Sequence, residues 1–253
     1  MLPMVRRNKT KDILKEKKNV TVTELSEKFK VTEETIRKDL KLLEQEGFLV
    51  KTYGGAFVQE GTLNDITVSI RKESYQENKI LIAQQAIKLI DNGDSVFLDS
   101  STTAYQIALA LKNKRITVAT KSLLICDCLS SANNVDLVMT GGILSRPHMS
   151  FIGKDAANTI GRYYFDKAFL SCRSVSLEHG ITDSNDEIAE VRRLVLSRAH
   201  GVFLVVDHTK FNKTSFVNIG GLQQVSAIIT DKPLEKKWKD HLDSKNIKVF
   251  VPE

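Results

Sequence analysis

The sequence predicts an α/β protein in two unequal parts, a small helical module at the N-terminus and a larger domain with a mostly parallel sheet. Two observations carry this prediction. Residues 1–57 contain charged stretches with helical periodicity, whereas from about Glu73 onward short apolar runs alternate with amphipathic stretches. Strands that alternate with helices are typical of a parallel sheet covered on both faces. A chain of 253 residues has room for one or two such domains.

The chain is basic, with a formal net charge of +6 and a pI of about 9.1. This suits a nucleic-acid partner without establishing one, because many proteins carry a similar excess. The first eighteen residues are the most basic stretch and are either an electrostatic anchor for a duplex or a solvated face. Their basic side chains are Arg6, Arg7, Lys9, Lys11, Lys15, Lys17 and Lys18.

The cysteines and the apolar runs exclude several classes of protein. Cys126, Cys128 and Cys172 lack the spacing of a metal site, so we expect reduced packing residues, no metal and no cofactor. No apolar run approaches the ~18 residues of a membrane span, and none resembles the core of a signal peptide. We therefore expect a cytoplasmic protein that does not contact a membrane.

Three helices are predicted in the N-terminal module. The first runs from about Arg7 to Lys17, the second follows Thr23, and the third follows Thr32 and ends at Gly47. Threonine is a favoured N-cap residue, and glycine often ends a helix. The apolar side chains at helical spacing in the second and third helices are Leu25, Phe29, Ile36, Leu40 and Leu43.

A helix-turn-helix over about residues 20–39 accounts for this pattern. In that motif the second helix lies in the major groove, and an arginine there can bind guanine bidentately. The segment 48–56 alternates and ends in glycines, which predicts a β-hairpin wing on the DNA backbone. The alternative is an amphipathic helix with a solvated basic face, followed by an ordinary hairpin. The predicted DNA-contacting residues are Thr32, Thr35, Arg37, Lys38, Lys41, Lys51, Tyr53 and Gly54.

The module resembles, without a gap, the N-terminal signature of the DeoR family of bacterial regulators. The matching runs are VTELS (22–26), FKVT (29–32), TIRKDL (35–40), GFL (47–49) and YGGA (53–56). The resemblance implies a winged helix-turn-helix that binds a double-stranded DNA operator. It also implies a C-terminal sensor domain similar to ribose-5-phosphate isomerase. The expected function is repression of a sugar or polyol catabolic operon by a dimer or tetramer that a phosphorylated sugar releases.

The larger domain is predicted at residues 75–253, after a polar linker at 58–74 that runs into a helix. Helical patterns recur at Ile80–Ile90, Ala104–Leu111 and Ile188–Ala199. Seven short apolar runs predict buried strands: Ser95–Leu98, Ile116–Ala119, Val135–Met139, Ala168–Leu170, Val202–Val206, Ala227–Ile229 and Val249–Val251.

Polar residues follow several of these strands. Asp99, Ser100, Ser101, Thr102 and Thr103 stand between a strand and a helix, where free N–H groups and hydroxyls can bind a phosphate. The same residue types are also ordinary helix caps, so a capped loop is the alternative. The family usually has glycine where Ser101 stands, so we expect the approach of the backbone to a ligand to differ here.

Further candidates follow other strands, because ligands of open α/β sheets bind beyond the carboxyl ends of strands. The resemblance implies roles for a glycine pair, for the block from Asp166 to Arg173 and for an Asp-x-x-Lys-Phe block at 207–211. Ser174 also replaces a usual glycine. The Asp and Lys of the last block bind the sugar or pair with each other. The added effector-binding candidates are Lys121, Gly141, Gly142, Arg173, Asp207 and Lys210.

Two other functions are open for this domain. A sugar-phosphate isomerase would need a carboxylate as general base. Glu187 and Glu190 are expected on the outside of their helix, and no nucleophile or phosphate-loop motif is present. We therefore predict that the chain is not an enzyme. The third alternative, a platform for oligomerisation, predicts no small-molecule binding.

Overall fold

The computed structural model describes residues 1–46, 48–52, 54–58 and 68–252, and the side chains of all these except 15, 69 and 70. The chain divides into two compact units, Met1–Tyr75 and Gln76–Glu253, and each is described by itself.

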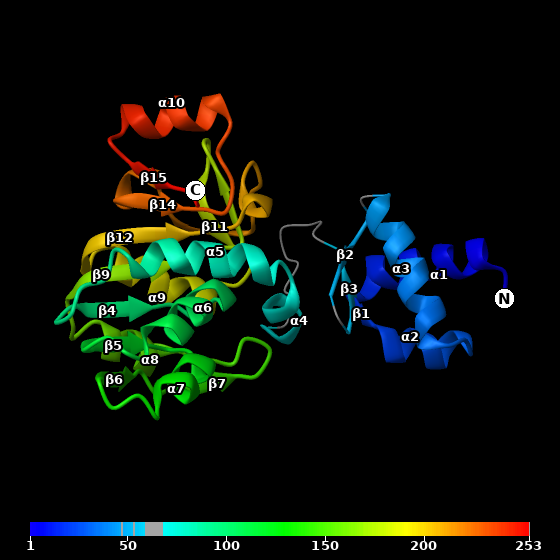
Figure 1. Cartoon of the computed structure of the whole chain (residues 1–253), viewed down its shortest axis with the longest axis horizontal. Coiled ribbons are helices and arrows are strands. Elements are labelled where there is room, and N and C mark those ends of the chain that lie inside the picture. Colours follow the sequence, from blue (N-terminus) through cyan, green and yellow to red (C-terminus); the bar gives the residue numbers. More distant parts are fainter. Residues whose placement is uncertain (47, 53, 59–67, 253) are drawn as a thin grey trace. The chain divides into compact units, whose positions relative to one another are not determined.

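The first unit packs helices against a small antiparallel sheet (Figure 1). Its helices are α1 (Pro3–Lys17), α2 (Val22–Phe29), α3 (Glu33–Gln45) and α4 (Val68–Glu73). Its strands, in spatial order, are β1 (Asn19–Thr21), β3 (Gly55–Phe57) and β2 (Val50–Lys51). The predicted apolar stripe is the core: Leu25, Leu40 and Leu43 are fully buried, and Ile36 and Phe29 nearly so.

Two predicted helix starts in this unit are wrong. α1 begins at Pro3 rather than near Arg7. The cap of α2 is Thr21, whose hydroxyl accepts from the N–H of Glu24 at 3.0 Å, and not Thr23. The cause is β1, an unpredicted strand that delivers Thr21 in an extended conformation at the point where the helix begins. The cap of α3 is Thr32, as predicted. Gly47 lies outside the described residues.

The wing is a hairpin of β2 and β3 that also pairs with β1. Gly55 allows β3 to approach β1, because a Cβ atom there would clash with the carbonyl oxygen of Val20. A Cβ atom on Gly54 would meet nothing within 4 Å. Of these two glycines, only Gly55 therefore lies too close to the protein's own backbone for a Cβ atom.

The second unit contains a seven-stranded parallel sheet, as predicted (Figure 1). Each predicted apolar run overlaps one of its strands. Their spatial order is β15 (Lys248–Phe250), β14 (Ala227–Ile229), β12 (Ala199–Val205), β9 (Phe165–Leu170), β4 (Ser95–Leu98), β5 (Ile116–Thr120) and β6 (Val135–Met139).

Helices cover both faces of this sheet. Side chains alternate between two apolar clusters: Phe97 belongs to one, and its neighbours Val96 and Leu98 belong to the other. The face of Val96 and Leu98 packs against α5 (Gln76–Ile87), α6 (Thr102–Leu111) and α7 (Leu123–Leu129). The opposite face packs against α8 (Lys154–Ile160), α9 (Asp186–Leu196) and α10 (Lys236–Ser244).

Smaller elements interrupt this pattern, and the sequence did not predict them. A second sheet has the order β10 (Ser174–Ser176), β11 (Gly180–Asp183) and β13 (Val217–Gly220), and β7 (Ile143–Ser145) pairs with β8 (Ser150–Ile152). The short 3-10 turns are η1 (His208–Lys210) and η2 (Leu222–Gln224). The segment from Gly180 to Asp183, which lies outside the predicted apolar runs, is a strand. None of the helices in the described residues is long and apolar enough to cross a membrane.

Candidate functional site

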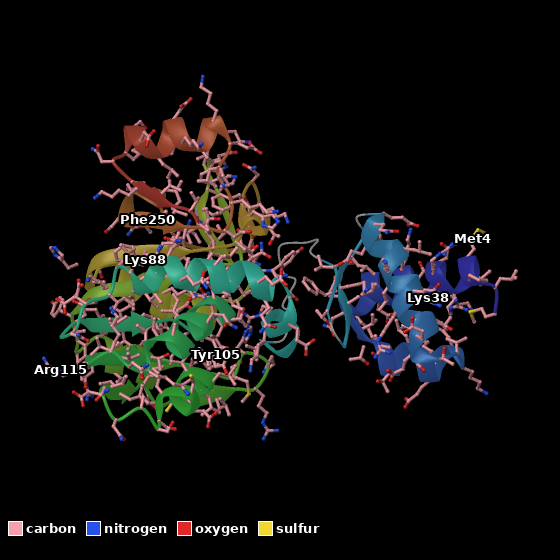
Figure 2. The ribbon with its side chains drawn as sticks, in the orientation of Figure 1. Met4, Lys38, Lys88, Tyr105, Arg115 and Phe250 are labelled. Atoms are coloured by element: carbon pink, nitrogen blue, oxygen red, sulfur yellow. The ribbon has the colours of Figure 1, made fainter. Side chains whose placement is uncertain are left out.

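The predicted DNA-contacting face lies on α3. Lys38 and Lys41 are exposed, and Figure 2 labels Lys38 on this helix. Thr32 caps the helix, and its hydroxyl lies 2.9 Å from that of Thr35. The first turn of the helix is therefore fixed at the end that, in a helix-turn-helix, meets the base edges.

Arg37 belongs to a network that spans α2 and α3. Its Nη2 donates to Oε2 of Glu33 at 2.8 Å, and Oε1 of Glu33 accepts from the hydroxyl of Thr23 at 3.0 Å. Both charged side chains are about two-fifths exposed, at 41% and 42%. A half-exposed pair of this kind contributes little to stability. In this arrangement the guanidinium points toward Glu33, near the start of the helix.

The wing is tied to the same helix. The N–H of Lys51 donates to Oε1 of Glu44 at 2.8 Å, and Gly54 is exposed. The predicted contact at Tyr53 lies outside the described residues. Lys51 and Gly54 therefore belong to a hairpin that α3 helps to position.

The basic N-terminal helix is less free to bind a duplex than its composition suggests. Arg6 is buried against Asp39 of α3 in an ion pair. Lys11 pairs with Glu46 at 2.7 Å, and Lys17 pairs with Glu24. These pairs join α1 to the rest of the module, so the excess of charge partly serves internal packing.

In the second unit, the predicted effector residues gather at one edge of the large sheet. Asp207, Arg173, Asp99 and Lys121 each follow a strand, and those strands, β12, β9, β4 and β5, are neighbours in that order. The chain runs outward from β4 to β6 and then returns to β9 on the other side of β4. The boundary between β4 and β9 is therefore a topological switch point, where open α/β sheets bind ligands.

Asp99 closes this switch point. Its Oδ1 accepts from the N–H of Ser101, and its Oδ2 accepts from the N–H of Ser171, each at 2.8 Å. Nε of Arg192 donates to the same Oδ2 at 2.9 Å, and Nη1 of Arg192 binds Asp183. Burial lowers the pKa of Arg192, but the two carboxylates outweigh it and raise that pKa. The carboxylate of Asp99 therefore holds the loops that surround the site.

Lys121 is fully buried beside this cluster. Its Nζ donates to the carbonyl oxygen of Ile188 at 3.1 Å. Burial and the charge of Arg192 lower its pKa to about 7, against the opposing effects of Asp99 and Asp183. The Lys121 amino group therefore gains or loses its proton near neutral pH.

The hydroxyl-rich turn begins α6. Ser101 is the N-cap, and its hydroxyl accepts from the N–H of Ala104 at 3.0 Å. Thr102 and Thr103 form the first turn, two residues before the predicted start, and both are buried with Ser100. A serine in place of the family's glycine thus caps the helix. The turn has the helix N-terminus and hydroxyls that suit an anion.

Basic side chains cluster beyond β12. Burial raises the pKa of Asp207, but the charges of Lys210 and Lys79 and the hydrogen bond from Thr209 outweigh it and lower that pKa. Lys79 is itself buried, in α5. The pKa of Lys213 is lowered by burial and by Arg173. A half-buried cluster with this excess of positive charge favours an anionic ligand.

The glycine pair after β6 is required by the conformation and close packing of the backbone. Gly141 and Gly142 have φ of +66° and +102°, a region that favours glycine. A Cβ atom on Gly142 would lie 2.7 Å from the carbonyl oxygen of Ile152. Gly142 also lies close to the N-terminal part of α8, since a Cβ atom there would lie 3.4 Å from the backbone nitrogen of Ala156.

Sequence reasoning missed Lys79, Arg192 and Asp183, because each lies on an element far along the chain from the strand ends. The resemblance implied that Asp166 precedes a strand and that the residues after it face the ligand. Asp166 lies instead within β9 near that strand's start, where its carboxylate accepts from the N–H and the hydroxyl of Ser95. The opposite ends of these strands border a hollow lined by Ser95, Tyr164, Asp166 and Arg198, among others.

The cysteines and the potential metal ligands of the described residues form no further reactive site. The three cysteines are free thiols, and no group of three potential ligands that could hold a metal ion occurs in this part of the chain. Burial raises the pKa of Cys172, so its thiol is not activated. Glu187 and Glu190 are exposed on α9.

Comparison with known families decides the identity of both units. Residues 6–62 match the family model of the DeoR-like helix-turn-helix domain, and residues 74–232 match that of the DeoR C terminal sensor domain. The chain belongs to the DeoR family of transcriptional regulators. As a member of the DeoR family, it is a DNA-binding regulator and not an enzyme.

Curated DeoR-family relatives align over nearly the whole chain. Identity is 36% over 249 residues to the uncharacterized HTH-type transcriptional regulator YulB of Bacillus subtilis, covering 98% of this chain and 96% of the relative. It is 32% to the putative aga operon transcriptional repressor of Escherichia coli O157:H7, covering 94% and 90%. It is 30% to the L-fucose operon activator of Escherichia coli K12, covering 87% and 92%.

Among solved structures, ribose 5-phosphate isomerase A from Methanocaldococcus jannaschii is similar at a TM-score of 0.41 and 18% identity, covering 55% of each chain. This likeness concerns the fold alone.

Proposed function

We propose that this regulator represses a sugar or polyol catabolic operon and that a phosphorylated sugar releases it from its operator. The observation that carries the proposal is a basic, hydroxyl-lined strand edge in a chain that also has a helix-turn-helix. Two relatives support an operon as the target, since one is named an operon repressor and the other an L-fucose operon activator. Their names are compatible with both repression and activation.

The DNA-contacting residues in this proposal are on α3 and the wing. Arg37 contacts a base edge, and the lysines and threonines contact phosphates. Two copies of the chain, in a cytoplasmic dimer or tetramer, hold their modules against half-sites spaced by about one helical turn of 10–10.5 base pairs or its multiples. The full set is Thr32, Thr35, Arg37, Lys38, Lys41, Lys51, Tyr53 and Gly54.

The effector lies in this proposal along the edge from β12 to β6. Its phosphate binds at the N-terminus of α6, with ammonium groups near it, and its hydroxyls bind the neighbouring loops. The set is Asp99, Ser100, Ser101, Thr102, Thr103, Lys121, Gly141, Gly142, Arg173, Asp207 and Lys210, to which Lys79 is added. The effector must bind the DNA-competent and DNA-incompetent states with different affinities, because only that difference shifts the equilibrium.

A panel of sugar phosphates tests the proposal on the purified full chain. Thermal unfolding measures binding of each compound, and operator binding measures its effect. We expect at least one compound to raise the melting temperature and to weaken operator binding. If no compound does either, the effector is not a sugar phosphate. A parallel assay of aldose–ketose interconversion is expected to show no turnover.

A further inference from the structure

Trp238 of α10, the single tryptophan of the sequence, packs into the loop that follows β12. Its side chain is 1% exposed, and its ring meets that of Phe211 edge-on with centroids 4.9 Å apart. Its Nε1 donates to Oδ1 of Asn212 at 2.9 Å. The match to the sensor-domain family ends at residue 232, so α10 lies beyond the matched segment.

Asn212 has a backbone conformation that needs support. Its φ is +58°, in the left-handed region that costs most residues free energy and that asparagine tolerates better than others. The hydrogen bond from Trp238 fixes its side chain as well. Beyond it, the N–H of Ser215 donates to the hydroxyl of Thr182 at 2.8 Å. The loop is therefore held from α10 on one side and from β11 on the other.

The turn at Asn212 separates Lys210, a candidate effector-binding residue, from Lys213 of the basic cluster beyond β12. Lys210 precedes it and lowers the pKa of Asp207, while Lys213 follows it and is itself partly desolvated. Where both ammonium groups lie depends on the turn between them. A contact that fixes Asn212 therefore fixes the positions of the ammonium groups that would bind an anion.

We propose that Trp238 and Asn212 are positioning residues of the effector site, and that α10 clamps the loop 207–215 so that its lysines face the ligand. The inference rests on the proposed function, since it assumes that an anion binds at this edge. It adds a role for α10, which lies beyond the segment matched by the sensor-domain family model.

The clamp is tested first without any ligand. Asn212→Gly keeps the left-handed turn and removes the acceptor for Trp238. Asn246→Gly is the matched control, because Asn246 also has a positive φ, +56°, and lies after α10. Hydrogen exchange of the full chain is expected to be about three- to tenfold faster in 207–215 for Asn212→Gly, the effect of one lost neutral hydrogen bond. Equal exchange in wild type and Asn212→Gly would overturn the clamp.

The effect on binding is tested with inorganic phosphate at constant ionic strength. Phosphate affinity is measured from the rise in melting temperature. Asn212→Gly and Trp238→Phe are expected to weaken it by about three- to tenfold. Operator binding without phosphate is expected to stay unchanged, as is phosphate binding by Asn246→Gly. A merely structural role would lower the melting temperature and leave its dependence on phosphate intact, which would overturn the positioning role.

The two hypotheses fail in different ways. If wild type binds neither phosphate nor any sugar phosphate, the proposed function falls and the positioning role falls with it, while hydrogen exchange still decides the clamp. If wild type binds and the variants bind equally well, the proposed function stands and the positioning role is wrong.

Discussion

At the scale of single residues, Lys121 and Arg192 are two buried cations whose pKa values shift in opposite directions. Arg192 lies between Asp99 and Asp183, and this pairing keeps the guanidinium charged. Lys121 donates to a carbonyl oxygen, which cannot neutralise a charge, and its pKa falls to about 7. Burial of a cation without sufficient compensation lowers its pKa in this way. The buried ammonium of Lys121 thus lowers the stability of the folded protein, and a nearby anion would offset this effect.

Lys121→Met tests this cost. A lysine whose pKa is about 7 when folded and 10.5 when unfolded opposes folding fully below pH 7, and less as the pH rises toward 10.5. We therefore expect the variant to be more stable than wild type at pH 6. Its advantage should shrink by about 1.4 kcal/mol per pH unit between pH 7 and 10. Urea unfolding at pH 6 and pH 9 measures the difference, and an equal pH dependence of both proteins would contradict the assignment.

Arg37 is the residue on which base recognition is expected to depend most. Glu33 holds its guanidinium, and a bidentate contact to guanine is lost when the side chain is removed. We expect Arg37→Ala to weaken specific operator binding by about 1–3 kcal/mol. Binding to unrelated duplexes should change much less.

Glu33→Gln is the companion variant, because it keeps Arg37 and removes the ion pair. It should relax base preference at one operator position without abolishing binding. Titration of operator and base-substituted duplexes measures both effects. Unchanged affinity in Arg37→Ala would exclude Arg37 from the base-contacting set.

At the scale of elements, short strands decide the geometry of the N-terminal module. β1 ends at the cap of α2 and pairs with β3 of the wing. The wing is therefore a continuation of a three-stranded sheet that includes the entrance to the helix-turn-helix. This connection explains why the cap of α2 lies at Thr21.

Adjacent glycines give a matched test of this sheet. Gly55→Ala places a Cβ atom against the carbonyl oxygen of Val20, and overpacking of this kind costs about 1–3 kcal/mol. Gly54→Ala meets no atom within 4 Å and should leave stability unchanged. Circular dichroism of the full chain during urea unfolding measures both. Equal stability of the two variants would show that β1 and β3 do not pack as closely as described.

At the scale of the whole molecule, one chain carries a DNA-binding module and a sensor domain. The proposed function requires that effector binding in one unit changes the affinity for DNA in the other. Thermodynamic linkage makes that coupling reciprocal, so an effector that weakens operator binding tenfold must itself bind tenfold more weakly to the operator complex.

Thr102→Ala is expected to separate the two activities. Thr102 begins α6 in the second unit, and its hydroxyl belongs to the proposed phosphate site. The variant should bind the operator with unchanged affinity and respond less to the effector. Operator titrations with and without the active sugar phosphate measure this. A normal response would remove the turn at α6 from the effector site.

Much of the fold was predictable because its signals are local. The seven apolar runs predicted the seven strands of the large sheet, since a buried parallel strand needs a continuous apolar stretch. Short antiparallel pieces such as β1, β7 and β10 were missed, because three residues carry too little pattern to separate a strand from a loop. Residues that act from a distant element, such as Lys79 and Arg192, gave no local signal.

The sequence by itself determined the two parts of the chain, the order along the chain of the seven strands of the large sheet, and the α3 face with Arg37 and Lys38. Periodicity and capping residues encode these features over a few neighbouring positions. Only the tertiary structure decided that Asp99, Ser171 and Arg192 meet at the boundary of β4 and β9, that Lys121 is buried, and that Trp238 reaches Asn212. The reason is physical: burial and the pairing of charges depend on which distant strands become neighbours, and local sequence patterns do not record that order.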